Sequence, residues 1–98
     1  MSPSARKKKL LLVGAGNLCL QILKILGPKN AFEFVVLGRN EDATLRLCNL
    51  VALSCAQLGH CIAIKPVIAD LTDIDRVTQV LREEAPDMVV NCASLQSW

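Results

Sequence analysis

The sequence predicts an α/β fold built on a parallel sheet, and three observations predict it. Apolar segments of strand length alternate along the 98-residue chain with longer amphipathic segments of helix length. The first apolar segment enters a Gly-x-Gly turn, and the chain leaves that turn as a helix. The second is almost continuously apolar, as expected for a strand covered on both faces. Together they predict the order βαβαβαβ, a partial, doubly wound sheet with strand order 3-2-1-4.

The turn after the first strand has the pattern that opens a nucleotide-binding βαβ unit. The strand is expected over residues 10–13 and the following helix over 17–26. Gly14 permits the tight turn, and Gly16 lacks a Cβ, so a pyrophosphate can approach the backbone at the helix N-terminus. Cys19 occupies the third position of the motif, where a small thiol still permits close helix-to-strand packing. These residues predict a Rossmann-like sheet.

Helical spacing and caps define the next elements. The first helix is expected to face the sheet through Leu18, Ile22, Leu23, Ile25 and Leu26. A second strand is predicted over residues 32–37. Asn40 then caps a second helix, which Gly59 ends. The expected inward positions of this helix are Leu45, Cys48, Val51, Ala52, Cys55 and Leu58.

The last elements complete the predicted sheet. A third strand over residues 61–68 contains Pro66, which favours a place at the sheet edge. Thr72 is expected to cap a helix over about 73–84, with Ile74, Val77, Val80 and Leu81 facing inward. A fourth strand is predicted over 87–91, with no fifth strand after it. The chain is therefore expected to be a fragment with an exposed strand edge, through which copies could associate.

Composition bounds the class of protein. One domain is expected over residues 10–98, behind a basic flexible tail over 1–9. No apolar stretch approaches the roughly 20 residues that a membrane helix needs, so no membrane contact and a cytoplasmic location are expected. The net charge is only +2, and the chain has two Phe, one Trp and no Tyr. This composition argues against nucleic-acid binding.

The cysteines are expected to act as small core residues. There are five, at positions 19, 48, 55, 61 and 92, and no two have Cys-x-x-Cys spacing. His60 is the only histidine and is interpreted as a solvated residue at a helix end. The sequence therefore predicts no metal site.

Polar residues that follow the strands are the candidate cofactor contacts, because ligands of such sheets bind at the carboxyl ends of the strands. Asn17 and Leu18 are expected to join the two glycines around the pyrophosphate. Arg39, followed by Asn40, stands where an NAD site has an acidic residue. Its guanidinium can pair with a 2′-phosphate, so NADP is favoured over NAD; the alternative is an ordinary surface cation. The missing acid also argues against an S-adenosylmethionine site.

The ends of the third and fourth strands supply the remaining candidates. Asp70 and Leu71 are placed to contact the adenine, although an aspartate there also commonly precedes a helix cap. Asn91, Cys92 and Ala93 would let the cofactor pass closely toward its nicotinamide end. The alternative for these three is a turn residue followed by small packing residues.

Four segments resemble the NADP-binding N-terminal domain of the saccharopine dehydrogenase or reductase family, with a looser likeness to short-chain dehydrogenases. They are Val-Gly-Ala-Gly-Asn-Leu at 13–18, Leu-Gly-Arg-Asn at 37–40, Ala-Asp-Leu at 69–71 and Pro-Asp-Met-Val-Val-Asn-Cys-Ala at 86–93. The resemblance implies hydride transfer between NADP and an imine or amino-acid-like small-molecule substrate. It also implies that a later domain, missing from this chain, supplies the substrate site and the catalytic groups.

No catalytic residue is identified in these 98 residues. A Tyr-x-x-x-Lys pair is excluded because the chain has no tyrosine. The alternative function is a non-catalytic module that senses a dinucleotide or binds another protein.

Overall fold

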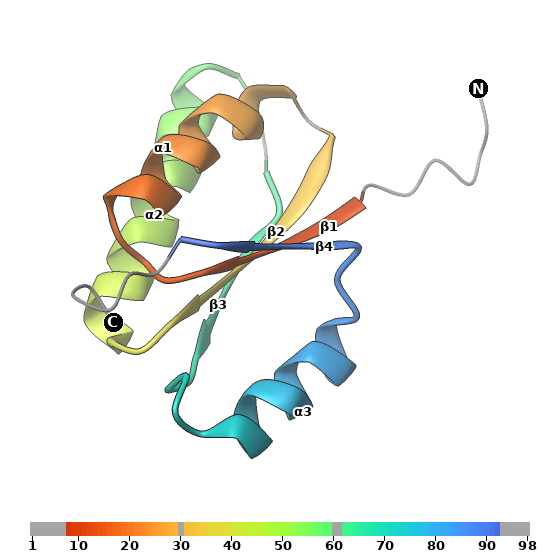
Figure 1. The fold of residues 1–98 in the computed structure, drawn as a ribbon. Coiled ribbons are helices and arrows are strands. Elements are labelled where there is room, and N and C mark those ends of the chain that lie inside the picture. The colour runs from red at the N-terminus through yellow and green to blue at the C-terminus, as the bar shows by residue number, and fades with distance from the viewer. Residues whose placement is uncertain (1–7, 30, 60–61, 93–98) are drawn as a thin grey trace.

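The computed structural model describes residues 8–29, 31–59 and 62–92. Strands and helices alternate along these residues (Figure 1). In chain order the elements are β1 (Lys8–Val13), α1 (Asn17–Leu26), the short 3-10 helix η1 (Gly27–Lys29), β2 (Phe32–Gly38), α2 (Glu41–Gln57), β3 (Ile64–Ile68), α3 (Ile74–Glu84) and β4 (Met88–Asn91). β1 thus begins two residues earlier than expected, and β3 begins three residues later.

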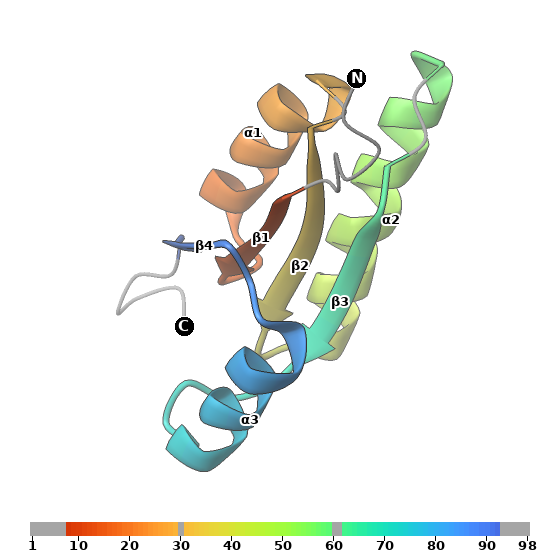
Figure 2. The same cartoon turned by 90° about the vertical axis from the view of Figure 1, so that its right-hand side faces the viewer.

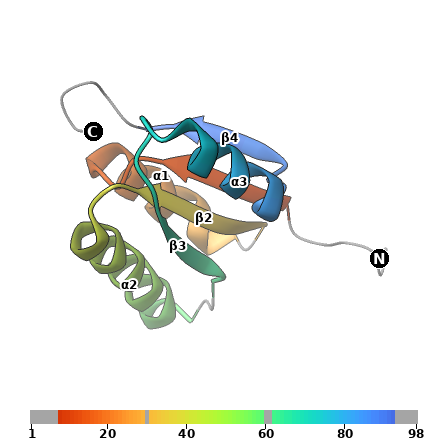
Figure 3. The ribbon, with the colours of Figure 1, turned by 90° about the horizontal axis from the view of Figure 1, so that it is seen from below.

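The strands form one parallel sheet in the order β3-β2-β1-β4, as predicted. Helices α1 and α2 pack on one face, and α3 packs on the other (Figures 1 and 3). Figure 2 shows β3 and β4 on either side of the central pair. Pro66 lies in the edge strand β3, also as predicted. The partial, doubly wound, Rossmann-like α/β fold is therefore confirmed.

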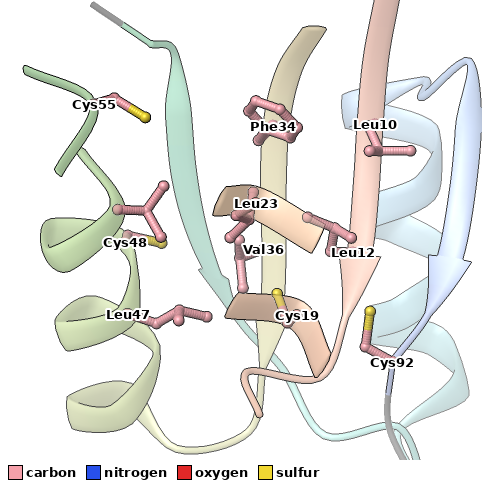
Figure 4. Packing of buried hydrophobic residues seen from close by; sticks show 11 residues of the cluster. Leu10, Leu12, Cys19, Leu23, Phe34, Val36, Leu47, Cys48, Cys55 and Cys92 are labelled. Carbon is pink, nitrogen blue, oxygen red and sulfur yellow. The ribbon is translucent and has the colours of Figure 1, made fainter. Parts of the chain in front are cut away.

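The central strands β1 and β2 are buried on both faces because successive side chains point to opposite cores. Toward α1 and α2 point Leu10, Leu12, Phe34 and Val36. Toward α3 point Leu11, Val13, Val35 and Leu37. Figure 4 shows the first core, where side chains of α1 and α2 cover the strands. Burial of each such side chain stabilises the fold by about 1.5–3 kcal/mol.

Helix α1 buries a different set of residues from the predicted one. Leu18 and Ile25 are 54% and 63% exposed, so their predicted inward positions are wrong. The buried and partly buried positions are Cys19, Leu20, Ile22, Leu23 and Leu26. The helix contacts the sheet along one side only. Leu18 and Ile25 are seven positions apart and therefore lie on the same side of the helix, and that side faces outward.

The other two helices need the same correction. The predicted inward residues Leu45, Leu58, Ile74 and Leu81 are exposed. Cys48, Val51, Cys55 and Val80 are buried as predicted. Helix α2 also buries Thr44 and Leu47, which were not expected to lie inside. The cap of α3 differs as well, because Asp73 rather than Thr72 accepts the hydrogen bond from the Arg76 backbone N–H.

Glu84 links three elements at the amino-terminal side of the sheet. Its Oε2 lies 2.7 Å from the Lys65 Nζ on β3, and its Oε1 lies 3.5 Å from the Lys9 Nζ on β1. The hydrogen bond from Lys65 is the largest cause that lowers the pKa of the Glu84 carboxyl, and Lys9 adds to the effect. A carboxyl whose pKa is depressed by folding stabilises the protein above its ordinary pKa, and that stabilisation is lost as the pH falls through the folded value.

We therefore expect Glu84→Gln to lower the free energy of unfolding by about 1 kcal/mol near pH 7. Near pH 3 the difference from the wild type is expected to shrink, because the wild-type carboxyl is then largely protonated. Urea unfolding at both pH values measures this. Glu83→Gln, at the exposed neighbouring position, is the matched control. An equal deficit at the two pH values would contradict the role of the charge.

The outer edge of β4 carries no partner strand within the described residues. Met88 and Val89 on this strand are about half exposed. Exposure of this edge and association of copies through it both stay predictions. No helix in the described ranges is long and apolar enough to cross a membrane.

The cysteines in the described part of the chain are core residues, as predicted. Cys19, Cys48, Cys55 and Cys92 are buried free thiols. Cys61 and His60 lie outside the described residues. Among residues 8–29, 31–59 and 62–92, no three His, Cys, Asp or Glu side chains gather in a way that could hold a metal ion.

Candidate dinucleotide-binding site

The Gly-x-Gly segment forms a tight turn between β1 and α1. Gly14 has φ of 100°, a left-handed conformation that favours glycine, and its N–H donates to the Leu37 carbonyl at 2.7 Å. Gly16 is the N-cap residue of α1 in an extended conformation. A Cβ added at Gly16 would meet no atom within 4 Å, so the space beside it is open. The turn thus leaves room for a ligand at the start of α1.

A cavity of about 100 Å³ joins this turn to the start of α2. Its lining consists of Gly14, Ala15, Gly16, Arg39, Asn40, Ala43 and Thr44. The structure therefore brings together four residues predicted for the site: the two glycines, Arg39 and Asn40. The sequence interpretation missed Ala15, Ala43 and Thr44. The sequence did contain a signal for Ala43 and Thr44. They stand three and four positions after Asn40, and residues at these distances lie on the same side of a helix as its cap.

The start of α2 is held by hydrogen bonds around Asn40. The Asn40 Oδ1 accepts from the Ala43 backbone N–H at 3.0 Å, which confirms the predicted cap. The buried Thr44 hydroxyl donates to the Asn40 carbonyl at 2.6 Å. Both Asn40 and Thr44 also line the cavity. The cavity wall is thus built by the same bonds that begin the helix.

We expect Asn40→Ala to destabilise the fold by about 1 kcal/mol, because the Ala43 N–H then loses its cap. Asn40→Asp is the matched variant, since its carboxylate can accept the same hydrogen bond. Thermal unfolding of the two variants and the wild type measures the difference. If the aspartate variant lost as much stability as the alanine variant, the cap would not be the reason.

Arg39 is the exposed, cationic side of the cavity. It follows Gly38, the last residue of β2, and precedes the Asn40 cap. The acidic residues of the first turn of α2, Glu41 and Asp42, do not line the cavity. An anionic group at this position would therefore meet a guanidinium rather than a carboxylate.

The predicted adenine contacts lie outside the cavity. Asp70 is exposed, and its Oδ1 accepts from the Thr72 backbone N–H at 2.9 Å and from the Thr72 hydroxyl at 2.8 Å. Leu71 packs partly buried against the core beneath α3. The bonds of Asp70 are those of a turn that leads into α3, which was the alternative interpretation of this residue.

The remaining predicted residues are not among those that line the cavity. Asn17 and Leu18 are exposed in the first turn of α1. Asn91 is exposed at the end of β4, opposite Val13 of β1. Cys92 is buried in the core, and its N–H donates to the Val13 carbonyl at 2.8 Å. Ala93 lies outside the described residues.

Fold and site together define a partial Rossmann-like α/β unit with an open Gly-x-Gly turn at the carboxyl edge of its sheet. No family model matches the sequence. No curated protein matches it either.

Solved structures with the same fold include three dehydrogenases. Malate dehydrogenase from Cryptosporidium parvum has a TM-score of 0.73 at 18% identity, over 92% of this chain and 26% of that one. Lactate dehydrogenase from the same organism has 0.70 at 20% identity, over 92% and 25%. A short-chain type dehydrogenase/reductase from Mycobacterium ulcerans has 0.71 at 18% identity, over 91% and 33%. This chain therefore spans a quarter to a third of each, and the likeness is one of fold.

Proposed function

We propose that this chain is the NADP-binding part of an oxidoreductase. The observation that carries the proposal is the cavity that places Arg39 opposite the Gly-x-Gly turn. Its volume is about 100 Å³, below the roughly 300–1,000 Å³ of pockets that enclose a whole small ligand. The cavity is of a size to hold the phosphate-bearing part of a dinucleotide. The rest of the cofactor would then extend along the carboxyl edge of the sheet.

The choice of NADP over NAD rests on charge. NADP differs from NAD by a phosphate on the ribose 2′-oxygen, and a guanidinium can bind such a phosphate through two parallel hydrogen bonds. Arg39 is exposed at the cavity rim and can turn its guanidinium toward this group. An NAD site would instead have a carboxylate at the end of β2. Leu37 and Gly38 occupy that end here.

Similarity of fold supports the oxidoreductase class. The Cryptosporidium lactate dehydrogenase structure contains nicotinamide adenine dinucleotide, and this chain shares the fold of about a quarter of that protein. We further propose, from the saccharopine dehydrogenase resemblance, that the substrate is an imine or an amino-acid-like molecule bound by a separate domain. The half-exposed Met88 and Val89 of β4 support a second candidate, a module that senses a dinucleotide or binds another protein without catalysis.

Calorimetric titration tests the cofactor proposal. The purified chain is first checked by circular dichroism for folding and is then titrated with NADPH and with NADH. We expect NADPH to bind at least about tenfold more tightly, as one or two charged hydrogen bonds would provide. A folded chain that bound neither cofactor would overturn the proposal. Equal affinity for NADPH and NADH would contradict the proposed role of Arg39 in selecting NADP, and only the proposal of a dinucleotide-binding site would stand.

A further inference from the structure

Exposed apolar side chains gather on the side of the molecule where the sheet ends at β4. Figure 2 shows β4 at the opposite edge of the sheet from β3. Six side chains from three elements lie on this side, and they are between 38% and 74% exposed. They are Leu18 and Ile25 on α1, Ile74 and Leu81 on α3, and Met88 and Val89 on β4. We call these six residues the β4-side surface.

On α1 the direction of the exposed side chains follows from the contact with α2. Gly27, the C-cap of α1, faces α2, because a Cβ added there would come within 2.9 Å of the Cys55 sulfur. Successive helix residues are about 100° apart, so Leu18 and Ile25 lie on the opposite side of the helix from Gly27. Since α2 packs over β2 and β3, this opposite side of α1 faces the β4 edge.

On α3 a cavity beside β3 gives the direction. Arg76 and Glu83 line this cavity together with Lys65 of β3. Ile74 and Leu81 each stand two positions before one of these residues, which is about 200° around the helix, so they point away from β3. Their side of α3 therefore also faces the β4 edge, while the charged side faces β3.

On β4 the two exposed side chains point to opposite faces of the sheet. Met88 lies in register with Leu10, whose side chain belongs to the core beneath α1 and α2. Val89 lies in register with Leu11, whose side chain belongs to the core beneath α3. The β4-side surface thus has a part in each helix layer and in the sheet, and none of its six residues is charged. An apolar surface of this kind is typical of an interface.

A second copy of this chain supplies all three layers at once. A two-fold axis perpendicular to the sheet at the β4 edge sets the two β4 strands antiparallel and keeps each helix layer on its own face. α1 then meets the α1 of the second copy, and α3 meets the second α3. Because the six residues are uncharged, none of them meets a like charge across the axis. A single helix or an extended peptide would cover only one of the layers.

We propose that this chain forms a two-fold symmetric dimer through the β4-side surface, in which the two sheets join into one. β4 pairs only with β1 among the described strands, and the second β4 pairs along its other edge. A stable interface buries roughly 800 Å² per partner, and the chain exposes 6266 Å². Covering one side of the molecule supplies an area of this order. None of the six residues lines the cofactor cavity, so the dimer leaves that cavity free.

Two charged variants test the surface, one in each helix layer. Ile74→Glu places a carboxylate in the first turn of α3, and Ile25→Lys places a cation in the last turn of α1. The helix dipole favours both charges, so both variants should fold. In the dimer each charge would be buried without a partner, and we expect the dissociation constant to rise at least about tenfold. Leu53→Glu is the matched control, because Leu53 is also more than half exposed but lies on α2.

Sedimentation velocity over a wide range of protein concentration measures the dissociation constant, and circular dichroism checks the fold of each variant. We expect the wild type and Leu53→Glu to form a dimer that dissociates on dilution. Ile74→Glu and Ile25→Lys should be monomers where the wild type is a dimer. A monomeric wild type would overturn the proposal and favour a different protein as the partner. Equal weakening by Leu53→Glu, or assembly beyond a dimer, would also overturn it.

Hydrogen exchange of the wild type gives a second measurement that does not depend on the folding of any variant. Backbone amides of β4 should exchange more slowly at high protein concentration than at low concentration, because the second β4 strand protects them. Amides of β3, at the other edge of the sheet, should be unchanged. Slower exchange at β3 instead of β4 would contradict the proposed interface. Neither measurement requires a bound cofactor.

Discussion

Arg39→Asp is expected to weaken NADPH binding by about 100-fold while changing NADH binding far less. Hydrogen bonds to charged groups contribute about 1.5–3 kcal/mol, and each 1.4 kcal/mol is a factor of ten in affinity. The substitution removes the guanidinium and places a carboxylate beside the 2′-phosphate, so repulsion adds to the lost attraction. NADH has no phosphate at this position, and aspartate can accept a hydrogen bond from its 2′-hydroxyl. The preference for NADPH should therefore be lost or reversed.

The matched control is Arg46→Asp. Arg46 is an exposed arginine on α2, the helix that begins after Arg39, but it lies outside the cavity lining. Both substitutions change the net charge by the same amount. A difference in cofactor affinity between the two variants therefore reports on the position of the arginine rather than on the net charge. Calorimetric titration of each variant with both cofactors measures the effect. Equal weakening of NADPH and NADH by Arg39→Asp, or similar effects of the two variants, would show that Arg39 does not bind the phosphate.

Gly38→Ala is expected to destabilise the fold by about 2–3 kcal/mol. Gly38 is the buried last residue of β2, and a Cβ at this position would overlap the hydroxyl oxygen of Thr44. Thr44 cannot easily move, because it is fully buried and its hydroxyl is bonded to the Asn40 carbonyl. Relief of the overlap requires α2 to shift from the sheet. That shift would also deform the cavity and weaken dinucleotide binding.

A double variant separates this overlap from a general effect of alanine. Thr44→Ala removes the overlapping oxygen, so Gly38→Ala should cost clearly less in that background than in the wild type. Gly16→Ala is a further control, because a Cβ at Gly16 meets no atom within 4 Å, so only the less favourable N-cap residue should lower stability, by about 0.5 kcal/mol. Urea unfolding of all four variants gives the comparison. Additive effects at positions 38 and 44 would contradict the steric explanation.

Local pattern was enough to predict the order of the elements and the faces of the strands. Successive side chains of a strand point to opposite faces of the sheet. The continuous apolar runs of β1 and β2 therefore predict that both faces of these strands are covered by other elements. The same pattern was insufficient for the helices, where Leu18 and Ile25 satisfy helical spacing but face solvent. Apolar residues around most of a helix leave its buried side undefined, and contact with the sheet selects it.

The candidate site divides in the same way. The glycine turn and Arg39 could be proposed from the sequence, because each has a local chemical signature at a strand end. The spacing after the Asn40 cap was a signal for Thr44, but its contact with Gly38 could not be predicted, because it depends on how α2 packs on the adjacent strand. Asp70 and Cys92 show the converse, since their described contacts are with Thr72 and with the core. Their sequence positions alone left both roles open.

By itself, the sequence determined the parallel α/β order, the glycine turn and the edge position of β3. Each of these depends on backbone conformations or hydrogen bonds that residue type and spacing limit directly. Only the tertiary structure decided which helix residues are buried and which residues line the cavity. These depend on how α1, α2 and the strand ends meet in space, because packing joins side chains that are distant along the chain.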